Sequence, residues 1–352
     1  MSQFGISLYL GTGYEKNVEI VAKAKQANVK YAFTSLHIPE ENVNDYAVQV
    51  KKLLDVCERS DVSLIVDIGP RTLEKLGYRS FSDLKQTSVS HLRVDYGFTY
   101  QQMIDLSKEF NIVFNASTLL EHDLRELRRL GADFTRFSAC HNFYPKPLTG
   151  LSLQKTRSIN ENLRRLGITT MAFVPGDQEL RGPLHRGLPT VEAHRGGDVL
   201  LNLLQLQKEC LTDICLVGDI DLSDRGWRGM GDLARGYVSL KAEIRPEYHF
   251  IMDGIHHDRP DSSEYVIRSQ ESRTYASQGR LFPAELVLPR EKGSISVGNE
   301  GYLRYSGELE IARRNLEPEN RVNIVGRVDE ADLPYLDYIT DGMGFRFVSA
   351  QE

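Results

Sequence analysis

The sequence has few cysteines, no long apolar run and no excess of basic residues. The four cysteines show neither zinc-type pairing nor a C-x-x-C motif, which favours a cytosolic protein with free thiols. No apolar run approaches the roughly 20 residues that a membrane helix needs, so we expect no membrane partner. No basic segment followed by an apolar one opens the chain, so we expect no signal peptide. A net charge of −6 argues against nucleic acid as the main partner.

What the sequence does contain is an alternation of apolar runs and amphipathic segments over its first two-thirds. Helical patterns with one apolar face separate most of the runs, for example at Val43–Ser60. Eight runs match the count of a parallel (β/α)₈ TIM barrel, and an open doubly wound sheet is the second choice. The expected strands are Phe4–Leu10, Tyr31–His37, Ser63–Gly69, His91–Gly97, Asn111–Ser117, Asp133–Ala139, Thr169–Gly176 and Ile214–Asp219.

The pattern changes near residue 245. A helix is expected over Trp227–Glu243, and short strand-like segments separated by turn residues follow it. With 352 residues the chain is long enough for two domains, and we predict a barrel domain over 1–245 and a smaller, mainly β domain over 246–352. The strands expected in the second domain are Glu264–Arg268, Glu285–Leu288, Ser294–Val297, Glu308–Ile311, Arg321–Val328 and Gly344–Val348.

One charged loop, Arg181–Arg195, directly follows the expected strand Thr169–Gly176. Two glycines and two prolines exclude a regular element there, and three arginines and two histidines surround one carboxylate, Glu192. In a TIM barrel, loops at the carboxyl ends of strands carry the chemistry, so this loop is a candidate anion site beside an acid or base. The alternative is an ordinary solvated surface loop.

Polar residues also stand where the expected strands end. Alternate residues of a barrel strand point inward, and the last ones reach the catalytic face. Burying such side chains inside a barrel costs free energy unless they are paired or take part in function. The alternative is a buried Arg93–Asp95 network, or one between Arg136 and an aspartate, that only braces the barrel. The polar residues in question are Asp67, Arg93, Asp95, Asn115, Ser117, Arg136, Ser138 and Asp219.

A second loop, His141–Ser152, follows the sixth strand and mixes aromatic rings with amide and hydroxyl groups. Rings stack on sugar faces and amides bind sugar hydroxyls, although Phe143 and Tyr144 could equally pack beneath the loop. Neighbours on a strand point to opposite faces, so Cys140 and His141 are not expected to form a nucleophile pair.

Two further motifs carry little weight. Gly11-Thr12-Gly13 lacks the third glycine of a dinucleotide-binding fingerprint, because Lys16 stands in its place. The run His256-His257-Asp258 has no other ligand cluster to complete a metal site. We therefore expect neither a cofactor nor a metal.

Seven segments that lie at or near the expected strand ends stand out in order along the chain: Leu92–Phe98, Asn115–Thr118, Cys140–Pro145, Thr149–Ser152, Arg181–Leu184, Gly187–Glu192 and His194–Arg195. Together they resemble segments of the MupG-type 6-phospho-N-acetylmuramidases, which are bacterial intracellular glycosidases. The resemblance runs over the whole chain and is most specific between residues 91 and 219. It implies a TIM barrel followed by a cyclophilin-like β domain, and hydrolysis, in cell-wall recycling, of a disaccharide with 6-phospho-N-acetylmuramic acid at its non-reducing end.

Residue chemistry then suggests roles for this phosphorylated amino-sugar substrate. A glycosidase needs a carboxylic acid and either a second carboxylate or the substrate's own acetamide. We expect Asp95 and Glu192 to be the working pair, with Asp67 or Asp219 able to replace either. Arginine suits the phosphate and lactyl carboxylate of the substrate. The substrate-binding candidates are Arg93, Asn115, His141, Asn142, Tyr144, Arg181, His194 and Arg195.

Other functions stay open at this point. A non-catalytic sugar-phosphate binding protein would use the same barrel for recognition alone. A sugar-phosphate aldolase or isomerase would normally want a Schiff-base lysine or a metal at a strand end, and the expected strand ends carry no lysine. A homo-oligomer is compatible with the sequence.

Overall fold

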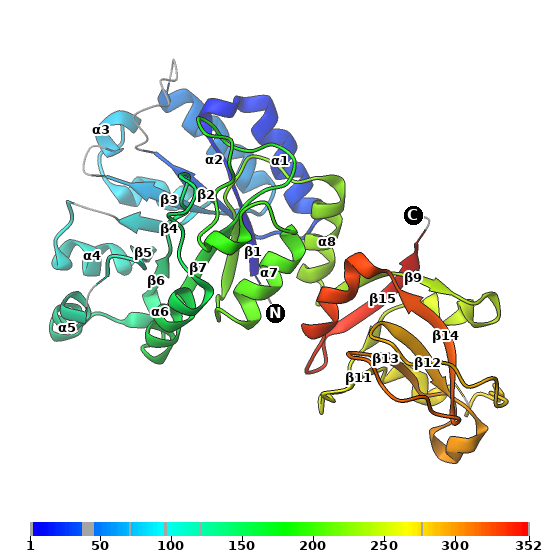
Figure 1. Cartoon of the computed structure of the whole chain (residues 1–352). Helices are drawn as coiled ribbons and strands as arrows, with labels where there is room; N and C mark the ends of the chain where they lie inside the picture. Colours follow the sequence, from blue (N-terminus) through cyan, green and yellow to red (C-terminus); the bar gives the residue numbers. More distant parts are fainter. Residues whose placement is uncertain are drawn as a thin grey trace. The chain divides into compact units, whose positions relative to one another are not determined.

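The computed structural model describes residues 3–36, 46–69, 72–94, 97–119, 121–275 and 277–350. The chain divides into two compact units, Met1–Ala234 and Arg235–Glu352. The first unit runs from blue to green in Figure 1, and the second from yellow-green to red. The division falls before the boundary predicted at residue 245, because the segment preceding that residue joins the sheet of the second unit.

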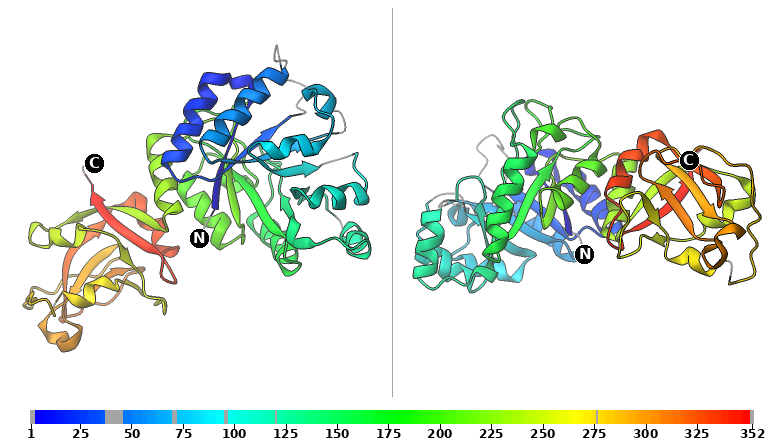
Figure 2. Two further views of the ribbon diagram at one scale, coloured as in Figure 1. Left: turned by 180° about the vertical axis from the view of Figure 1, so that it is seen from behind. Right: turned by 60° about the horizontal axis from the view of Figure 1, so that its bottom comes forward.

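The first unit is a closed barrel of parallel strands, as the sequence predicts. The first strand pairs with both the second and the eighth, which closes the sheet and excludes the open doubly wound alternative. In the two views of Figure 2 the helices of this unit lie outside its strands. The barrel strands are β1 (Gln3–Ser7), β2 (Tyr31–Ser35), β3 (Ser63–Ile68), β4 (Val89–Val94), β5 (Asn111–Asn115), β6 (Phe137–Cys140), β7 (Thr169–Val174) and β8 (Ile214–Val217).

The helices between these strands follow the predicted order. Among the described residues they are α1 (Tyr14–Gln26), α2 (Tyr46–Arg59), α3 (Thr72–Leu76), α4 (Tyr100–Ser107), α5 (Glu121–Arg129), α6 (Leu153–Arg165), α7 (Val199–Lys208) and α8 (Asp224–Ala234). Short 3₁₀ helices are η1 (Leu10–Thr12), η2 (Phe81–Gln86), η3 (Phe134–Arg136) and η4 (Glu192–His194). No helix of the described residues combines the length and the apolar character that crossing a membrane requires.

Local sequence signals explain these helices. In α2 the residues Val50, Leu53, Leu54 and Cys57 repeat at helical spacing and are all buried, so they form its core-facing side. Helix α6 begins where the Ser152 hydroxyl accepts a hydrogen bond from the Lys155 amide, which satisfies an otherwise unpaired donor of the first turn. Side-chain caps of the same kind begin α4 at Thr99 and α7 at Asp198.

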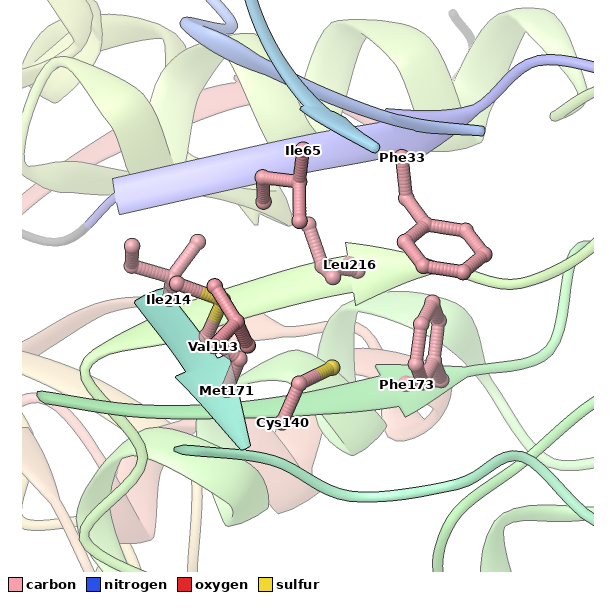
Figure 3. Packing of buried hydrophobic residues seen from close by; sticks show 8 residues of the cluster. All are labelled: Phe33, Ile65, Val113, Cys140, Met171, Phe173, Ile214 and Leu216. Carbon is pink, nitrogen blue, oxygen red and sulfur yellow. The ribbon is translucent and has the colours of Figure 1, made fainter. Parts of the chain in front are cut away.

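The barrel interior is filled by side chains rather than open. Phe33, Ile65, Val113, Met171 and Leu216 come from five different strands and pack together with their neighbours in Figure 3. Inward-pointing residues of alternate strands form such packed layers in TIM barrels. The upper part of this core supports the functional site described below.

Strand β6 is shorter than predicted. The first residues of the expected strand Asp133–Ala139 form η3, because the Asp133 side chain accepts a hydrogen bond from the Thr135 amide and turns the backbone into a helical conformation. Cys140 at the end of β6 lies in the barrel core, whereas His141 contacts Asn160 of α6. The two side chains therefore point to different sides of the sheet, as strand geometry predicts.

The second unit is mainly β, which confirms the predicted fold class. Its seven described strands form one sheet in the order β10-β15-β9-β14-β12-β13-β11. All neighbouring pairs are antiparallel except β15 and β9. The strands are β9 (Tyr237–Ile244), β10 (His256–His257), β11 (Val266–Arg268), β12 (Ser294–Gly298), β13 (Leu309–Ala312), β14 (Val322–Val328) and β15 (Gly344–Ser349), and the 3₁₀ helices are η5 (Pro246–Met252), η6 (Glu271–Thr274), η7 (Glu300–Tyr305) and η8 (Glu330–Asp337).

Two element predictions were wrong here. The expected helix Trp227–Glu243 stops at Ala234, since Gly236 adopts a φ of 91° and the next residues become strand β9 with alternating burial. The expected strand Glu285–Leu288 is not part of the sheet. Its Glu285 carboxylate binds Arg245 and the Tyr248 hydroxyl instead, and Leu286 is exposed.

Candidate active site

Three polar residues meet at the carboxyl ends of barrel strands. Asp67 on β3 lies 3.2 Å from the Arg93 guanidinium on β4, and Arg93 donates a 2.6 Å hydrogen bond to Asn142, which follows β6. The Ser35 hydroxyl on β2 donates to the second Asp67 oxygen at 3.3 Å. Asp67 and Arg93 are each 6% exposed. Burying a charged pair costs free energy unless the surrounding protein satisfies its hydrogen-bonding groups. This pair lies on the face of the barrel where TIM-barrel enzymes have their active sites.

These residues line a cavity of about 660 Å³ at the mouth of the barrel. One wall is aromatic: Phe143 packs edge-on against both Phe33 and Phe173, with ring centroids 6.5 and 5.1 Å apart. Phe33 and Phe173 also belong to the barrel core, so the floor of the cavity is the top of that core. A cavity of this size with apolar walls and a few polar groups fits a small organic ligand.

Arg181, in the loop that follows β7, contributes a positive charge to the cavity wall. The Arg181 guanidinium lies over the ring of Tyr9, 4.0 Å from its centroid. Tyr9 is itself fixed, because its hydroxyl donates to the Gly218 carbonyl. The ring face attracts the cation and sets its position. Arg181 and Arg93 are the two arginines among the described residues that line this cavity.

Asp219 shapes that loop from beneath. Its carboxylate accepts hydrogen bonds from the backbone amides of Gly176 and Arg181 at 2.9 Å and of Leu188 at 3.0 Å. The side chain is buried, and burial raises the pKa of Asp219 although these three amides act in the opposite direction. Asp219 does not line the cavity, so its contacts are those of a residue that holds the Gly176–Leu188 backbone.

Glu192 and Arg195 form a second support, outside the cavity lining. Glu192 accepts two hydrogen bonds from Arg195, at 2.7 and 2.8 Å, and one each from the backbone amides of Leu148 and Gly150, both at 2.8 Å. The Arg195 hydrogen bonds, followed by the two amides, lower the pKa of Glu192 to about 2 against the opposing effect of burial. Its carboxylate therefore stays ionised and joins the His141–Ser152 loop to the Arg181–Arg195 loop.

Arg195 has all of its donors engaged by protein. Besides Glu192, its guanidinium donates to the carbonyls of Arg186 at 3.0 Å, Gly187 at 2.9 Å and Tyr144 at 2.8 Å. A guanidinium has five N–H groups, and these five bonds use every one. Arg195 therefore has no donor left for a phosphate, in contrast to the expectation from its charge alone.

Two of the three histidines of these loops, His141 and His194, are fully buried. Burial lowers the pKa of His141, and it lowers that of His194 to about 4, so both rings are neutral at physiological pH. His141 lines the cavity and contacts Asn160 of α6 at 2.8 Å. His194 does not line it and contacts Gln205 of α7 at 3.2 Å.

Asn115 and Tyr144, two further sequence candidates, do not line this cavity. Asn115 accepts a hydrogen bond from the Ser117 amide and lines a separate cavity of about 480 Å³ together with residues of α4 and α5. The Tyr144 hydroxyl lies 3.4 Å from the Ser117 hydroxyl, and the Tyr144 backbone binds Pro189 and Arg195. Asp95 lies outside the described residues.

Sequence reasoning missed several residues of the site. Ser35 ends β2 with the same inward parity as the candidates on the other strands, so the strand-end argument could have included it. Nothing in the sequence marks Tyr9, Phe33 and Phe173 as site residues, because an aromatic residue in or beside an apolar strand is usually interpreted as part of the hydrophobic core. Asn160 was also missed, since a single amide on an amphipathic helix is ordinary.

The His256-His257-Asp258 run is used within the second unit. His256 binds the Ser269 hydroxyl and the Ile251 carbonyl, and His257 binds Glu271 at 2.8 Å. Asp258 is buried and pairs with Arg313 at 3.4 Å. In the part of the chain that the structure describes, no group of three or more histidine, cysteine, aspartate or glutamate side chains is arranged to hold a metal ion.

Comparison with known proteins gives a consistent result over both units. The family model of the 6-phospho-N-acetylmuramidase N-terminal region matches residues 4–232, and that of its C-terminal region matches residues 237–348. A conserved Enterococcus faecalis protein of unknown function has a similar structure, with 30% identity, a TM-score of 0.78, and coverage of 99% of this chain and 96% of that one.

A second solved structure, an uncharacterized B. cereus protein, has 25% identity and a TM-score of 0.75, with 99% of each chain covered. No curated protein matches the chain. The two solved structures share the fold over the full length of this chain, while the family models connect that fold to an enzymatic activity.

Proposed function

We propose that this chain, which belongs to the 6-phospho-N-acetylmuramidase family of glycoside hydrolases, cleaves 6-phospho-N-acetylmuramic acid from the non-reducing end of a disaccharide whose second sugar is N-acetylglucosamine. The observation that carries this proposal is the cavity at the barrel mouth, where Asp67 and Arg93 face an aromatic wall and Arg181. In a cell this reaction would belong to cell-wall recycling in the cytoplasm.

Asp67 is the carboxylate that we assign to the reaction. Of the three candidate carboxylates within the described residues, Asp67 lines the cavity, whereas Glu192 and Asp219 hold loop backbones. The Arg93 partner favours the ionised form, so Asp67 suits a base, a nucleophile or a stabiliser of the positive charge that develops at the anomeric carbon. The proton donor to the leaving oxygen is then a different group, and Asp95 is the candidate that the sequence offers.

Arg181 is the residue that we assign to the substrate phosphate. Its guanidinium is held over Tyr9 at the cavity wall, and arginine binds phosphate with two parallel hydrogen bonds. Arg195 and His194, which share its loop, contact protein groups and do not line the cavity. Asn142 and Phe143 supply an amide and a ring for the sugar.

The test is direct hydrolysis. The purified chain is incubated with 6-phospho-N-acetylmuramyl-N-acetylglucosamine, with the unphosphorylated disaccharide as the matched substrate, and free N-acetylglucosamine is measured. We expect release from the phosphorylated disaccharide and far slower release from the other. Binding of the phosphorylated disaccharide without release of N-acetylglucosamine would favour a sugar-phosphate binding function instead. Equal rates of hydrolysis of the two disaccharides would contradict recognition of the phosphate.

A further inference from the structure

Asn142 extends its side chain over the interior of the barrel mouth. The residue lies in the loop that follows β6, where its backbone carbonyl accepts a hydrogen bond from the Thr190 hydroxyl at 2.9 Å. Its side chain reaches Arg93 on β4, which is in register with Asp67 on β3 and with Val113 on β5. Val113 belongs to the barrel core, and residues in register on neighbouring strands point to the same side of the sheet. The Arg93 and Asn142 side chains therefore meet on the inner side of the barrel.

Arg93 determines how the Asn142 amide is turned. The Arg93 guanidinium approaches the Asn142 side-chain oxygen at 2.6 Å. A guanidinium has only donors, so the group that it meets must be the amide oxygen and cannot be the amide nitrogen. The nitrogen, with its two N–H groups, is thereby turned away from Arg93.

That nitrogen is a free donor at the cavity. It has accessible surface and no hydrogen-bond partner among the described residues, and Asn142 is a half-buried residue of the cavity lining. The amide cannot rotate to offer its oxygen instead without losing the charge-assisted hydrogen bond from Arg93. A ligand in the cavity therefore meets an N–H donor at this position.

The same guanidinium holds this donor beside Asp67. One terminal nitrogen of Arg93 lies 3.2 Å from the Asp67 carboxylate, and the other donates to Asn142. Both nitrogens belong to one rigid plane, so the carboxylate and the amide are neighbours. Because the Asp67 charge repels a second anion nearby, the acceptor that Asn142 binds is an uncharged one.

We propose that the Asn142 amide nitrogen donates a hydrogen bond to the acetamide carbonyl of the sugar whose bond is cleaved, and that this contact selects 2-acetamido sugars. The inference rests on the proposed function, in which Asp67 acts at the anomeric carbon, and deepens it. The acetamido group stands on the carbon next to the anomeric carbon, so a donor held beside Asp67 faces it. The phosphate is attached beyond the ring oxygen and is assigned to Arg181. Arg93 is then a positioning residue for Asn142.

Asn142→Asp tests the donor, because the two side chains have the same shape. A carboxylate oxygen keeps the contact with Arg93, while a second acceptor replaces the N–H donor. Binding of 6-phospho-N-acetylmuramic acid and of its 2-deoxy counterpart, which has hydrogen in place of the acetamido group, is measured by calorimetry in both proteins. The preference of wild type for the acetamido sugar should fall by about ten- to a hundredfold in Asn142→Asp. The new negative charge acts on the anionic groups of both sugars, so its effect cancels in this ratio.

Nuclear magnetic resonance of wild type gives a second test that does not depend on how the variant folds. In the chain labelled with ¹⁵N at asparagine, the side-chain amide resonances of Asn142 should shift on addition of 6-phospho-N-acetylmuramic acid and much less on addition of the 2-deoxy sugar. Asn160 is a matched internal control, because it is fully buried and its amide nitrogen donates to the Cys210 carbonyl and the Thr212 hydroxyl. Its resonances should stay in place with both sugars.

The outcomes separate this inference from the proposed activity. An unchanged preference in Asn142→Asp, or equal shifts of the Asn142 amide with both sugars, overturns the acetamide contact, while hydrolysis of the phosphorylated disaccharide still supports the activity. The expected loss of preference without hydrolysis of that disaccharide overturns the activity and retains the contact. Absence of both binding and hydrolysis overturns both.

Discussion

Glu192 and Arg195 bind one another through both carboxylate oxygens, at 2.7 and 2.8 Å, and neither residue borders the cavity. The remaining donors of Arg195 and the remaining acceptor positions of Glu192 are used by backbone groups of two loops. We call Glu192 and Arg195 the loop clamp. Two of the charges that mark this region in the sequence therefore bind each other and the backbone of two loops.

The first prediction separates two arginines of the same loop. Arg181→Ala should lower kcat/KM for a phosphorylated substrate by about ten- to a hundredfold, which is the loss expected for a charged hydrogen bond. The kcat/KM for the unphosphorylated substrate should change little. Arg195→Ala should lower both by the same factor and should also lower the melting temperature, because it releases Glu192 and three carbonyls. Kinetics on the paired substrates and a melting scan distinguish them, and a phosphate-selective loss in Arg195→Ala would contradict this division.

The second prediction concerns pH and the loop clamp. The pKa of Glu192 is about 2 in the folded chain against an ordinary 4.5, so the folded state favours the ionised form. The resulting stability is fully present above pH 4.5 and is lost as the pH falls toward 2. Glu192→Gln should therefore unfold more easily than wild type near neutral pH, by about 2 kcal/mol, and the difference should shrink in acid. Denaturant unfolding at several pH values measures it, and a constant difference would contradict the assignment.

The third prediction compares two buried carboxylates at the barrel mouth. Asp67→Asn should lower kcat by about 10²–10⁴ while the chain stays folded, because the variant keeps the shape but loses the charge that faces the cavity. Asp219→Asn is the matched control. It removes acceptor capacity from three backbone amides, so it should lower the melting temperature more than kcat. Normal turnover in Asp67→Asn with a lowered melting temperature would assign Asp67 to bracing the barrel.

The fourth prediction uses the close approach of Gly150 to the loop clamp. A Cβ at this position would lie 2.7 Å from a Glu192 carboxylate oxygen and 2.8 Å from the Glu192 backbone nitrogen, so Gly150→Ala must displace Glu192. We expect a destabilisation of about 1–3 kcal/mol. The effect should not add to that of Glu192→Gln, because both changes disrupt one set of contacts. Ser152→Ala, which removes only the cap of α6, should add fully, and additivity of Gly150→Ala would contradict the argument.

The barrel could be predicted from the sequence because its signals are local. Strand–helix alternation, the apolar face of α2, and Gly131 and Gly167 after two helices all depend on residues a few positions apart, and both glycines have the expected positive φ. The same reasoning failed at β9, where the alternation of Val238, Leu240 and Ala242 was read as the end of a helix. Period-two and helical patterns are hard to separate when a glycine such as Gly236 lies between them.

The sequence by itself determined the order of strands and helices in the barrel, the fold class and the group of charged loops among which the cavity lies. Only the tertiary structure decided which of those charges line the cavity. Asp67, Arg93 and Asn142 come together because three different parts of the barrel end at one face, while Arg195 turns away because five protein acceptors surround it. Charge and parity are properties of a segment, but the partner of a charged group is set by the register and closure of the whole barrel and by the paths of its loops.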